Sequence, residues 1–188
     1  MKILETKRVV LREIVEDDAA FALDLLNQPS FIKYIGDRGV RSLAEAREFI
    51  VTRYRPSYLE HGFGLYVVEL KTEFAAPSDS GTLTNVRVSA LPGAPIGICG
   101  FVKRDTLPDP DIGFAFLPQH CQQGYAYEAA AAVMLYGRDV LQLKRILAIT
   151  TQDNESSGRL LEKIGFEFVR LVKMPHDEDE LKLFSSEA

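Results

Sequence analysis

Hydrophobic and polar positions along this chain follow two periods, one typical of strands and the other typical of helices. Runs rich in β-branched and apolar residues predict strands over residues 8–14, 65–70, 96–102, 112–117, 144–151, 167–172 and 181–184. Apolar residues at helical spacing predict helices after Asp17, after Ser42, from Tyr125 to Val140 and after Asn154. This order of elements is typical of a mixed α/β sheet with helices on its faces.

Local signals mark the ends of several predicted helices. Ser42 and Glu45 have the spacing of a capping box, which begins a helix. Asn154 is a favourable N-cap residue, and Gly165 stands where helices commonly end in the left-handed conformation. We expect the helix that starts at Tyr125 to bury one face made of small and apolar residues, together with the apolar residues on either side of that face. These positions are Ala126, Ala129, Ala130, Val133, Met134, Leu135, Gly137 and Val140.

The segment from Lys71 to Pro95 separates two predicted strands and is rich in proline, serine and small residues. Within it, residues 84–89 alternate like an exposed strand. A connection of this length is uncommon inside a compact domain. We interpret it as an enlarged loop or hairpin insertion within a single domain that covers residues 1–188.

The stretch from Asp111 to Tyr127 combines a strand, a polar loop and the start of a helix. Pro118 ends the strand, and Gly124 allows the backbone a positive φ or a close approach to a ligand. The first turn of a helix offers free backbone N–H groups and a dipole that favours anions. The loop lacks the lysine and hydroxyl residue of a P-loop and the three glycines of a dinucleotide fingerprint. Two interpretations stay open, a phosphate site and an ordinary strand-to-helix connection.

Composition narrows the class of protein. The chain has 188 residues, of which 46% are hydrophobic, and this is enough for one sizeable core. A formal net charge of -5 argues against nonspecific binding to nucleic acid. No apolar run has the length of a membrane span, and the first residues are too charged for a signal peptide. Cys99 and Cys121 have no ligand-like spacing to the histidines, so we expect a cytoplasmic protein without a structural metal.

Five short motifs occur in a fixed order along the chain. They are VVLREIVEDD near the start, GFGLYVVE at 62–69, DIGFAFLP, QQGYAYEAA, and NESSGRLLEKIGFEF at 154–168. In type and spacing they resemble the GNAT acyltransferase superfamily, and most closely its branch of ribosomal-protein N-terminal acetyltransferases. The resemblance covers nearly the whole chain. It implies a single N-acetyltransferase domain with a mostly antiparallel sheet of about seven strands, flanking helices and a splayed cofactor cleft.

By this resemblance, the polar loop is the pyrophosphate site for acetyl-CoA. The family's loop frame falls on Cys121 to Ala126, with cysteine where the family has arginine or glutamine. This departure removes one phosphate-facing side chain, so backbone N–H groups are expected to bind the diphosphate. The preceding strand is expected to hold the pantetheine arm as an added strand would, and Asn154 to bind a pantetheine amide. The implied cofactor-binding residues are Phe114, Ala115, Phe116, Gln122, Gln123, Gly124, Tyr125, Ala126, Tyr127 and Asn154.

Acetyl transfer from a thioester to an amine needs a neutral amine, a stabilised oxyanion and a proton for the departing thiolate. Asp111 stands where many family members carry a catalytic glutamate, and it is the first candidate for a base that acts through water. A solvated loop aspartate is the alternative interpretation, and Glu13 and Glu69 are further candidates for the base. The resemblance makes Ser157 the proton donor, because Leu161 replaces the tyrosine of other members; a capping hydroxyl is the alternative.

Other polar residues have competing interpretations. Glu128 is expected to complement the helix dipole and not to act in catalysis. No acid or base at a supporting spacing identifies Cys121 as an acyl-accepting thiol, and His120 is interpreted as a solvated loop residue. Tyr34 and Tyr66 either line the acceptor cleft or belong to the core. Arg159 and Lys163 either bind the 3′-phosphate of the cofactor or lie on a solvated helix face.

These features predict an acetyl-CoA-dependent N-acetyltransferase that acts, without a metal, on a peptide or protein N-terminus or on a small amine. The main alternative is a domain that binds acyl-CoA as a sensor or scaffold without turnover. A nucleotide-binding protein is a third alternative, but no Mg²⁺-binding carboxylate or P-loop lysine accompanies the loop. Neither nucleic acid nor a membrane is an expected partner, and the sequence leaves monomer and homodimer open.

Overall fold

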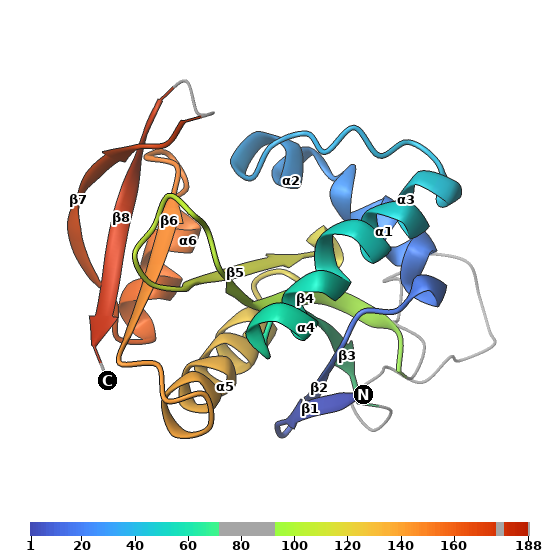
Figure 1. The fold of residues 1–188 in the computed structure, drawn as a ribbon, viewed down its shortest axis with the longest axis horizontal. Coiled ribbons are helices and arrows are strands. Elements are labelled where there is room, and N and C mark those ends of the chain that lie inside the picture. Colours follow the sequence, from blue (N-terminus) through green and yellow to red (C-terminus); the bar gives the residue numbers. More distant parts are fainter. Residues whose placement is uncertain (72–92, 176–178, 188) are drawn as a thin grey trace, which may run out of the picture.

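The computed structural model describes residues 1–71, 93–175 and 179–187. A central sheet of eight strands has the order β1-β2-β3-β4-β5-β6-β8-β7 (Figure 1). Its strands are β1 (Lys2–Glu5), β2 (Val9–Arg12), β3 (Leu65–Leu70), β4 (Pro95–Val102), β5 (Asp111–Phe116), β6 (Arg145–Thr150), β7 (Glu167–Lys173) and β8 (Glu180–Glu187). Neighbouring strands are antiparallel except β5 and β6, which run parallel. The predicted mixed, mostly antiparallel sheet is therefore confirmed.

β1 is the strand that the hydrophobic pattern did not predict. It has four residues, and its pairing with β2 places Leu4 opposite Leu11. A strand this short is stable only beside a longer partner, so its own sequence carries little signal. The seven predicted strands are present, with boundaries that differ by at most a few residues. The strand predicted over residues 84–89 lies outside the described residues.

Helices cover both faces of the sheet. They are α1 (Ala19–Leu26), α2 (Pro29–Tyr34), α3 (Leu43–Phe49), α4 (Arg55–His61), α5 (Tyr125–Asp139) and α6 (Glu155–Lys163), with shorter helical turns η1 (Glu16–Asp18), η2 (Ile50–Tyr54) and η4 (Pro118–His120). The predicted cap at Ser42 is confirmed, because its Oγ accepts a 3.3 Å hydrogen bond from Glu45 N. Gly165, with a φ of +93°, follows the end of α6 as predicted. None of the described helices has the length and apolar composition that a membrane crossing requires.

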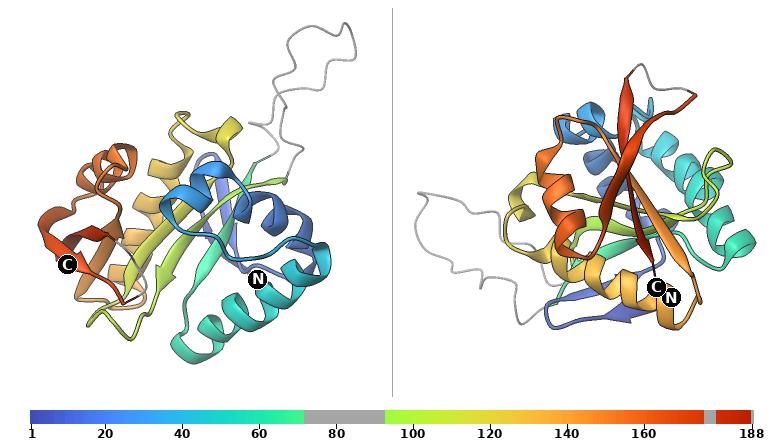
Figure 2. Two further views of the ribbon diagram at one scale, coloured as in Figure 1. Left: turned by 90° about the horizontal axis from the view of Figure 1, so that it is seen from above. Right: turned by 90° about the vertical axis from the view of Figure 1, so that its left-hand side faces the viewer.

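α5 and α6 pack on one face of the sheet, and α1 to α4 cover the other (Figure 2). α5 approaches the strands closely at Gly137, where an added Cβ would lie 2.5 Å from the ring of Phe101. Two residues of the predicted buried face are instead exposed, Leu135 by 60% and Val140 by 63%. Leu135 points about 140° around the helix from buried Ala130, and Val140 lies beyond the last turn.

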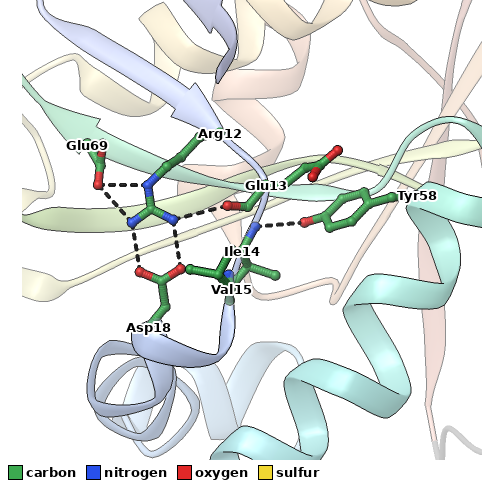
Figure 3. Close-up of polar contacts among 7 residues, drawn as sticks. All are labelled: Arg12, Glu13, Ile14, Val15, Asp18, Tyr58 and Glu69. Carbon is green, nitrogen blue, oxygen red and sulfur yellow. Dashed lines mark hydrogen bonds and ion pairs between the residues drawn. The ribbon is translucent and has the colours of Figure 1, made fainter. Parts of the chain in front are cut away.

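Arg12, at the end of β2, joins three elements (Figure 3). Its guanidinium forms two 2.7 Å hydrogen bonds with Asp18 and a 2.8 Å hydrogen bond with Glu69 on β3. Asp18 also accepts a 2.8 Å hydrogen bond from Val15 N. Hydrogen bonding to Asp18 raises the pKa of Arg12 above its usual value, against the opposing effect of burial. This cluster fixes the turn that leads from β2 into α1 and gives Glu69 a structural partner.

Candidate functional site

β5 and β6 share one paired position and then separate. Asp111 is in register with Leu147, and Leu147 N donates a 2.9 Å hydrogen bond to Pro110 O. Both strands are described in full, and no second pair forms between them. Residues Gly113–Ala115 are only half-buried, although β5 lies in the interior of the sheet. The backbone groups on the β6 side of β5 therefore have no strand partner, and an extended ligand can pair with them.

The loop between β5 and α5 holds two residues in the left-handed backbone region. Gln122 has a φ of +59° and Gly124 a φ of +82°. This conformation costs a non-glycine residue about 1–2 kcal/mol, and such strain is concentrated at ligand sites. In the part of the chain that the structure describes, no backbone N–H group from Gln122 to Tyr127 donates to a protein acceptor. These donors lie just before and in the first turn of a 15-residue helix, and together with its dipole they form a candidate anion site.

Glu128, in the first turn of α5, fixes this loop to the turn between β1 and β2. Its carboxylate accepts hydrogen bonds from Thr6 Oγ1 at 2.6 Å, Arg8 N at 2.7 Å and Arg8 Nε at 2.6 Å. Arg8 Nη1 donates to Gln123 O at 2.9 Å, and the guanidinium lies 4.5 Å from the centre of the Tyr125 ring. Burial opposes ionisation of Glu128, but the hydrogen bonds from Thr6 and Arg8 outweigh it and lower its pKa.

Asn154 begins α6 at the end of β6. Its Oδ1 accepts hydrogen bonds from Ser157 N at 3.2 Å and from Ser156 Oγ at 3.0 Å, which confirms the predicted N-cap. Among the described residues, neither Asn154 Nδ2 nor Ser157 Oγ has a hydrogen-bond acceptor. Because β5 and β6 run parallel, α5 and α6 begin at the same edge of the sheet. Donors from both helices are therefore available where the two strands are separated.

Asp111 lies at the narrow end of the separation, and its interpretation as a solvated loop aspartate is wrong. It is the first residue of β5 and is 1% exposed. Arg104 Nε donates to its Oδ1 at 2.9 Å. Burial raises the pKa of Asp111 to about 6, and the charge and hydrogen bond of Arg104 limit the rise. A carboxylate with this pKa is ionised at neutral pH and is a stronger base than an exposed aspartate.

Residues 8–167 match the family model described as an acetyltransferase (GNAT) domain. The chain belongs to the GNAT acetyltransferase family. It is 30% identical over 166 residues to the uncharacterized N-acetyltransferase YoaA of Bacillus subtilis, covering 88% of this chain and 82% of that protein. A GNAT acetyltransferase from Bacillus anthracis has the same fold, with a TM-score of 0.73, 23% identity, and coverage of 100% and 98%. The ribosomal L7/L12 alpha-N-protein acetyltransferase RimL, solved with coenzyme A, has a TM-score of 0.76 at 13% identity, with coverage of 100% and 98%.

Membership of the GNAT family confirms the resemblance of the five motifs, and it makes the protein an N-acetyltransferase. The described ranges contain no group of three or more His, Cys, Asp or Glu side chains that could hold a metal ion. The polar groups around the separation of β5 from β6 are the candidates for a GNAT reaction.

Of three further polar residues considered for a chemical role, only His120 has surroundings that differ from those expected. Glu13 is half-buried, with its carboxylate 3.9 Å from the Met1 amine. His120 is 8% exposed, so its interpretation as a solvated loop residue is wrong. Its ring packs 6.4 Å from that of Tyr125, and burial lowers its pKa. Cys121 is exposed as a residue, but partial desolvation of its thiol raises its pKa, which disfavours the thiolate that an acyl-cysteine mechanism would need.

Of the two tyrosines considered for the acceptor, Tyr66 belongs to the core. It is 1% exposed and stacks on Tyr58 with 5.7 Å between ring centres. Tyr34, on α2, is half-buried, and its hydroxyl accepts a 3.2 Å hydrogen bond from Lys33 Nζ. Lys33 also pairs with Asp153 at 2.8 Å, so α2 contacts the loop that precedes α6. This contact links α2 to the end of β6, next to the separation of β5 from β6.

The two cations on α6 have different surroundings. Arg159 pairs with Glu155 at 3.0 Å on an exposed face, as the solvated-face interpretation predicts. Lys163 Nζ lies 4.3 Å from the centre of the Tyr127 ring and is therefore next to the first turn of α5. Sequence reasoning missed the role of Arg8, because its partner Glu128 is 120 residues away. The available signal was a charged residue directly before the apolar run at 9–11.

Proposed function

We propose that this GNAT enzyme transfers the acetyl group of acetyl-CoA directly to a primary amine of a small molecule or of a peptide or protein N-terminus. The observation that carries the proposal is the separation of β5 from β6 after their single pair at Asp111. At the open end of this separation stand the N-termini of α5 and α6, with donors for which the described residues provide no acceptor. An extended ligand with a strongly anionic end fits this arrangement, and coenzyme A has both properties.

In this proposal, the coenzyme follows β5 from the loop toward Asp111. Backbone N–H groups from Gln122 to Tyr127 bind the diphosphate, and the backbone of Phe114–Phe116 pairs with the pantetheine arm. The unpaired donors and the half-buried strand support this placement. Asn154 Nδ2 is proposed to donate to a pantetheine carbonyl while its Oδ1 caps α6. Cys121 brings no charge to the phosphates, so the affinity depends on the main chain.

The reaction begins with attack of the amine lone pair on the thioester carbonyl carbon. Collapse of the tetrahedral intermediate breaks the C–S bond and releases the coenzyme thiolate. Asp111 is proposed to take the amine proton through a water molecule, because its side chain is buried at the narrow end of the separation. An α-amino group has a pKa of roughly 8 and a lysine of roughly 10.4, so the α-amino group needs less help. A base with a pKa of about 6 is better matched to the α-amino group.

Ser157 is proposed to return a proton to the thiolate. Its Oγ has no acceptor among the described residues, and its position is fixed because its N–H bonds to Asn154. Leu161, at the position where the resemblance expected a tyrosine, is 1% exposed in the core and donates nothing. A thiol has a pKa near roughly 8.5, so water can also protonate the thiolate. The loss of Ser157 is therefore expected to slow turnover only modestly.

The acceptors of structurally similar proteins support an amine substrate. RimL is an alpha-N-protein acetyltransferase for ribosomal L7/L12. The spermidine N-acetyltransferase from Vibrio cholerae, solved with CoA and spermine, has a TM-score of 0.71 at 16% identity. At this identity the likeness concerns the fold, so the choice between a peptide N-terminus and a polyamine has to be tested with both.

Two measurements test the proposal in sequence. Thermal unfolding with acetyl-CoA at about 100 times its dissociation constant should show a stabilisation of about 2.7 kcal/mol, and ATP at equal concentration should show none. Thiol release should then follow addition of one member of a panel of peptides with free N-termini, polyamines and lysine. Stabilisation without thiol release from any acceptor would favour a sensor that binds acyl-CoA. The absence of stabilisation would contradict both the enzyme and the sensor.

A further inference from the structure

Arg8 has no part in the chemistry above, yet it contacts the cofactor loop on both sides of Gly124. Its Nη1 binds Gln123 O, immediately before the glycine, and its backbone N and Nε bind the Glu128 carboxylate in the first helical turn. Its guanidinium also stacks on the ring of Tyr125. A Cβ added to Gly124 would lie 3.1 Å from Arg8 Nη2, so the side chain lies directly against the loop.

The geometry of these contacts is that of a rigid clamp. The guanidinium is planar, so a donor to Gln123 O and a donor to Glu128 are held at a fixed separation. The side chains of Arg8 and Glu128 are only 28% and 17% exposed, so the charge-assisted hydrogen bonds between them are stronger than exposed ones, whereas the bond from Arg8 Nη1 to Gln123 O is exposed. Thr6 Oγ1 donates to the same carboxylate and holds it from a third direction.

We propose that Arg8 is a positioning residue for the reaction: acting through Gln123 and Glu128, it holds the loop between β5 and α5 in the conformation that binds the coenzyme diphosphate. The inference rests on the proposed function. A loop that already has its bound conformation loses less conformational entropy when the ligand binds. Removal of Arg8 should therefore weaken ligands that carry the diphosphate and should leave the pantetheine arm, which binds along β5, unaffected.

The test compares two ligands in Arg8→Ala. Calorimetry with CoA should give a dissociation constant about tenfold above that of the unmodified protein. A titration with pantetheine, followed by NMR, should change by less than about twofold. Arg55→Ala is the matched control, since it removes another arginine–glutamate pair, with Glu16 at 3.2 Å, at a distant and exposed place. An equal weakening of both ligands, or of neither, would overturn the inference and indicate a structural contact only.

Glu128→Gln provides a second test, which can be read even if Arg8→Ala does not fold. Its outcome is the direction in which the affinity for CoA changes. It removes a negative charge next to the diphosphate, so electrostatics alone predicts tighter CoA binding. Positioning predicts weaker binding, because Arg8 loses its charged partner. Tighter binding would contradict the inference.

Two further variants test whether Arg8 acts through this pair. Arg8→Ala combined with Glu128→Ala should weaken CoA no more than one substitution does, whereas additive losses would exclude a joint action. Arg8→Lys keeps the charge without the planar fork, so it should recover less than half of the lost affinity; full recovery would point to charge alone. The unmodified protein's CoA titration tests the proposed function separately: without binding there, the function and the inference both fail.

Discussion

The two helix N-termini beside the separated strands are held in different ways. The loop before α5 is fixed by Arg8 and Glu128, whose hydrogen bonds of 2.6 and 2.7 Å lie in partly buried surroundings. α6 is capped by its own Asn154, and the preceding loop is held by Lys33 through an ion pair with Asp153. The side chains of that pair are 58% and 57% exposed.

This difference sets an expectation for how the two sides contribute to ligand binding. Exposed ion pairs contribute about 0–1 kcal/mol, whereas charge-assisted hydrogen bonds in partly buried places contribute more. The α5 side should therefore be preformed, as suits the diphosphate that every acyl-CoA carries. The α6 side should change its conformation more readily when a ligand binds. Asp111 belongs to neither side, since it lies where β5 and β6 still pair.

The largest effect is expected at that junction. Asp111→Asn keeps the size of the side chain and removes the proposed base, so kcat/KM should fall about 10²-fold or more. The CoA dissociation constant should change by less than about twofold, because neither helix N-terminus is altered. Steady-state kinetics with the best acceptor and calorimetry with CoA measure the two quantities. If kcat/KM is retained, Asp111 is a structural residue and another group accepts the proton.

The pH dependence of Asp111 gives a second test of the junction. The base must be ionised and the amine neutral, so the slope of log kcat/KM against pH should decrease at about pH 6, and kcat/KM should level off only above the pKa of the acceptor amine, roughly 8 for an α-amino group. Arg104 limits the rise of this pKa, and Arg104→Ala should therefore move the acid limb of the profile to higher pH. A profile without an inflection near pH 6, or one that Arg104→Ala leaves in place, would contradict the assignment.

The same pKa makes a prediction for stability, with a definite sign. The carboxyl group has a pKa of 3.8 as its ordinary value and about 6 in the folded protein, so folding favours the protonated form. The stability that this contributes is complete below pH 3.8 and is lost as pH rises to about 6. Relative to Asp111→Asn, the unmodified protein should lose on the order of 3 kcal/mol across this window. Urea unfolding of both proteins at several pH values measures the difference.

Gly124→Val tests the preformed α5 side. Valine in the left-handed region is strained, and its side chain would displace Arg8 from 3.1 Å. CoA affinity should fall at least about tenfold, with a loss of stability of about 1–2 kcal/mol. Gly62→Val is the matched control, since Gly62 also has a positive φ, of +74°, but has open space around it and ends α4. The control should lose similar stability and keep its CoA affinity; equal loss of affinity in both would break the comparison.

Asn154→Ala and Asn154→Ser separate the two roles proposed on the α6 side. Alanine removes the cap and should cost about 1 kcal/mol of stability, together with a severalfold loss of CoA affinity. Serine restores the cap but not the amide donor, so it should recover stability and leave the CoA affinity low. Recovery of both by serine would mean that Asn154 acts as a cap only.

Lys33→Ala should have the smallest effect. The ion pair with Asp153 is exposed, and its loss should change the free energy of unfolding by less than about 1 kcal/mol and the CoA affinity by less than about twofold. Urea unfolding and calorimetry measure both quantities. A larger loss of affinity would show that α2 holds the α6 side as firmly as Arg8 holds the α5 side, which would remove the difference between the two.

Local signals in the sequence predicted the features that depend on few neighbouring residues. Ser42 and Asn154 cap their helices because the bonds they make lie within three residues. Burial of His120 and the clamp from Arg8 to Glu128 depend on segments that are distant in sequence, and the pattern gave no warning of either.

The separation of β5 from β6 came from the family resemblance and not from periodicity. The sequences of both strands are ordinary apolar runs, and they do not predict how many residues of β5 pair with β6. The sequence also did not show that Asp111 is buried. Burial raises the pKa of this carboxyl group, and this makes it a candidate base at the narrow end of the separation.

A titration of the ¹⁵N-labelled protein with CoA, followed by NMR, tests the central claim most directly, and a 21.0 kDa chain is suited to it. The claim predicts that the largest amide shifts occur from Gln122 to Tyr127, followed by Phe114–Phe116 and Asn154. Shifts that avoid the loop between β5 and α5, or no shifts at CoA concentrations of several millimolar, would contradict it.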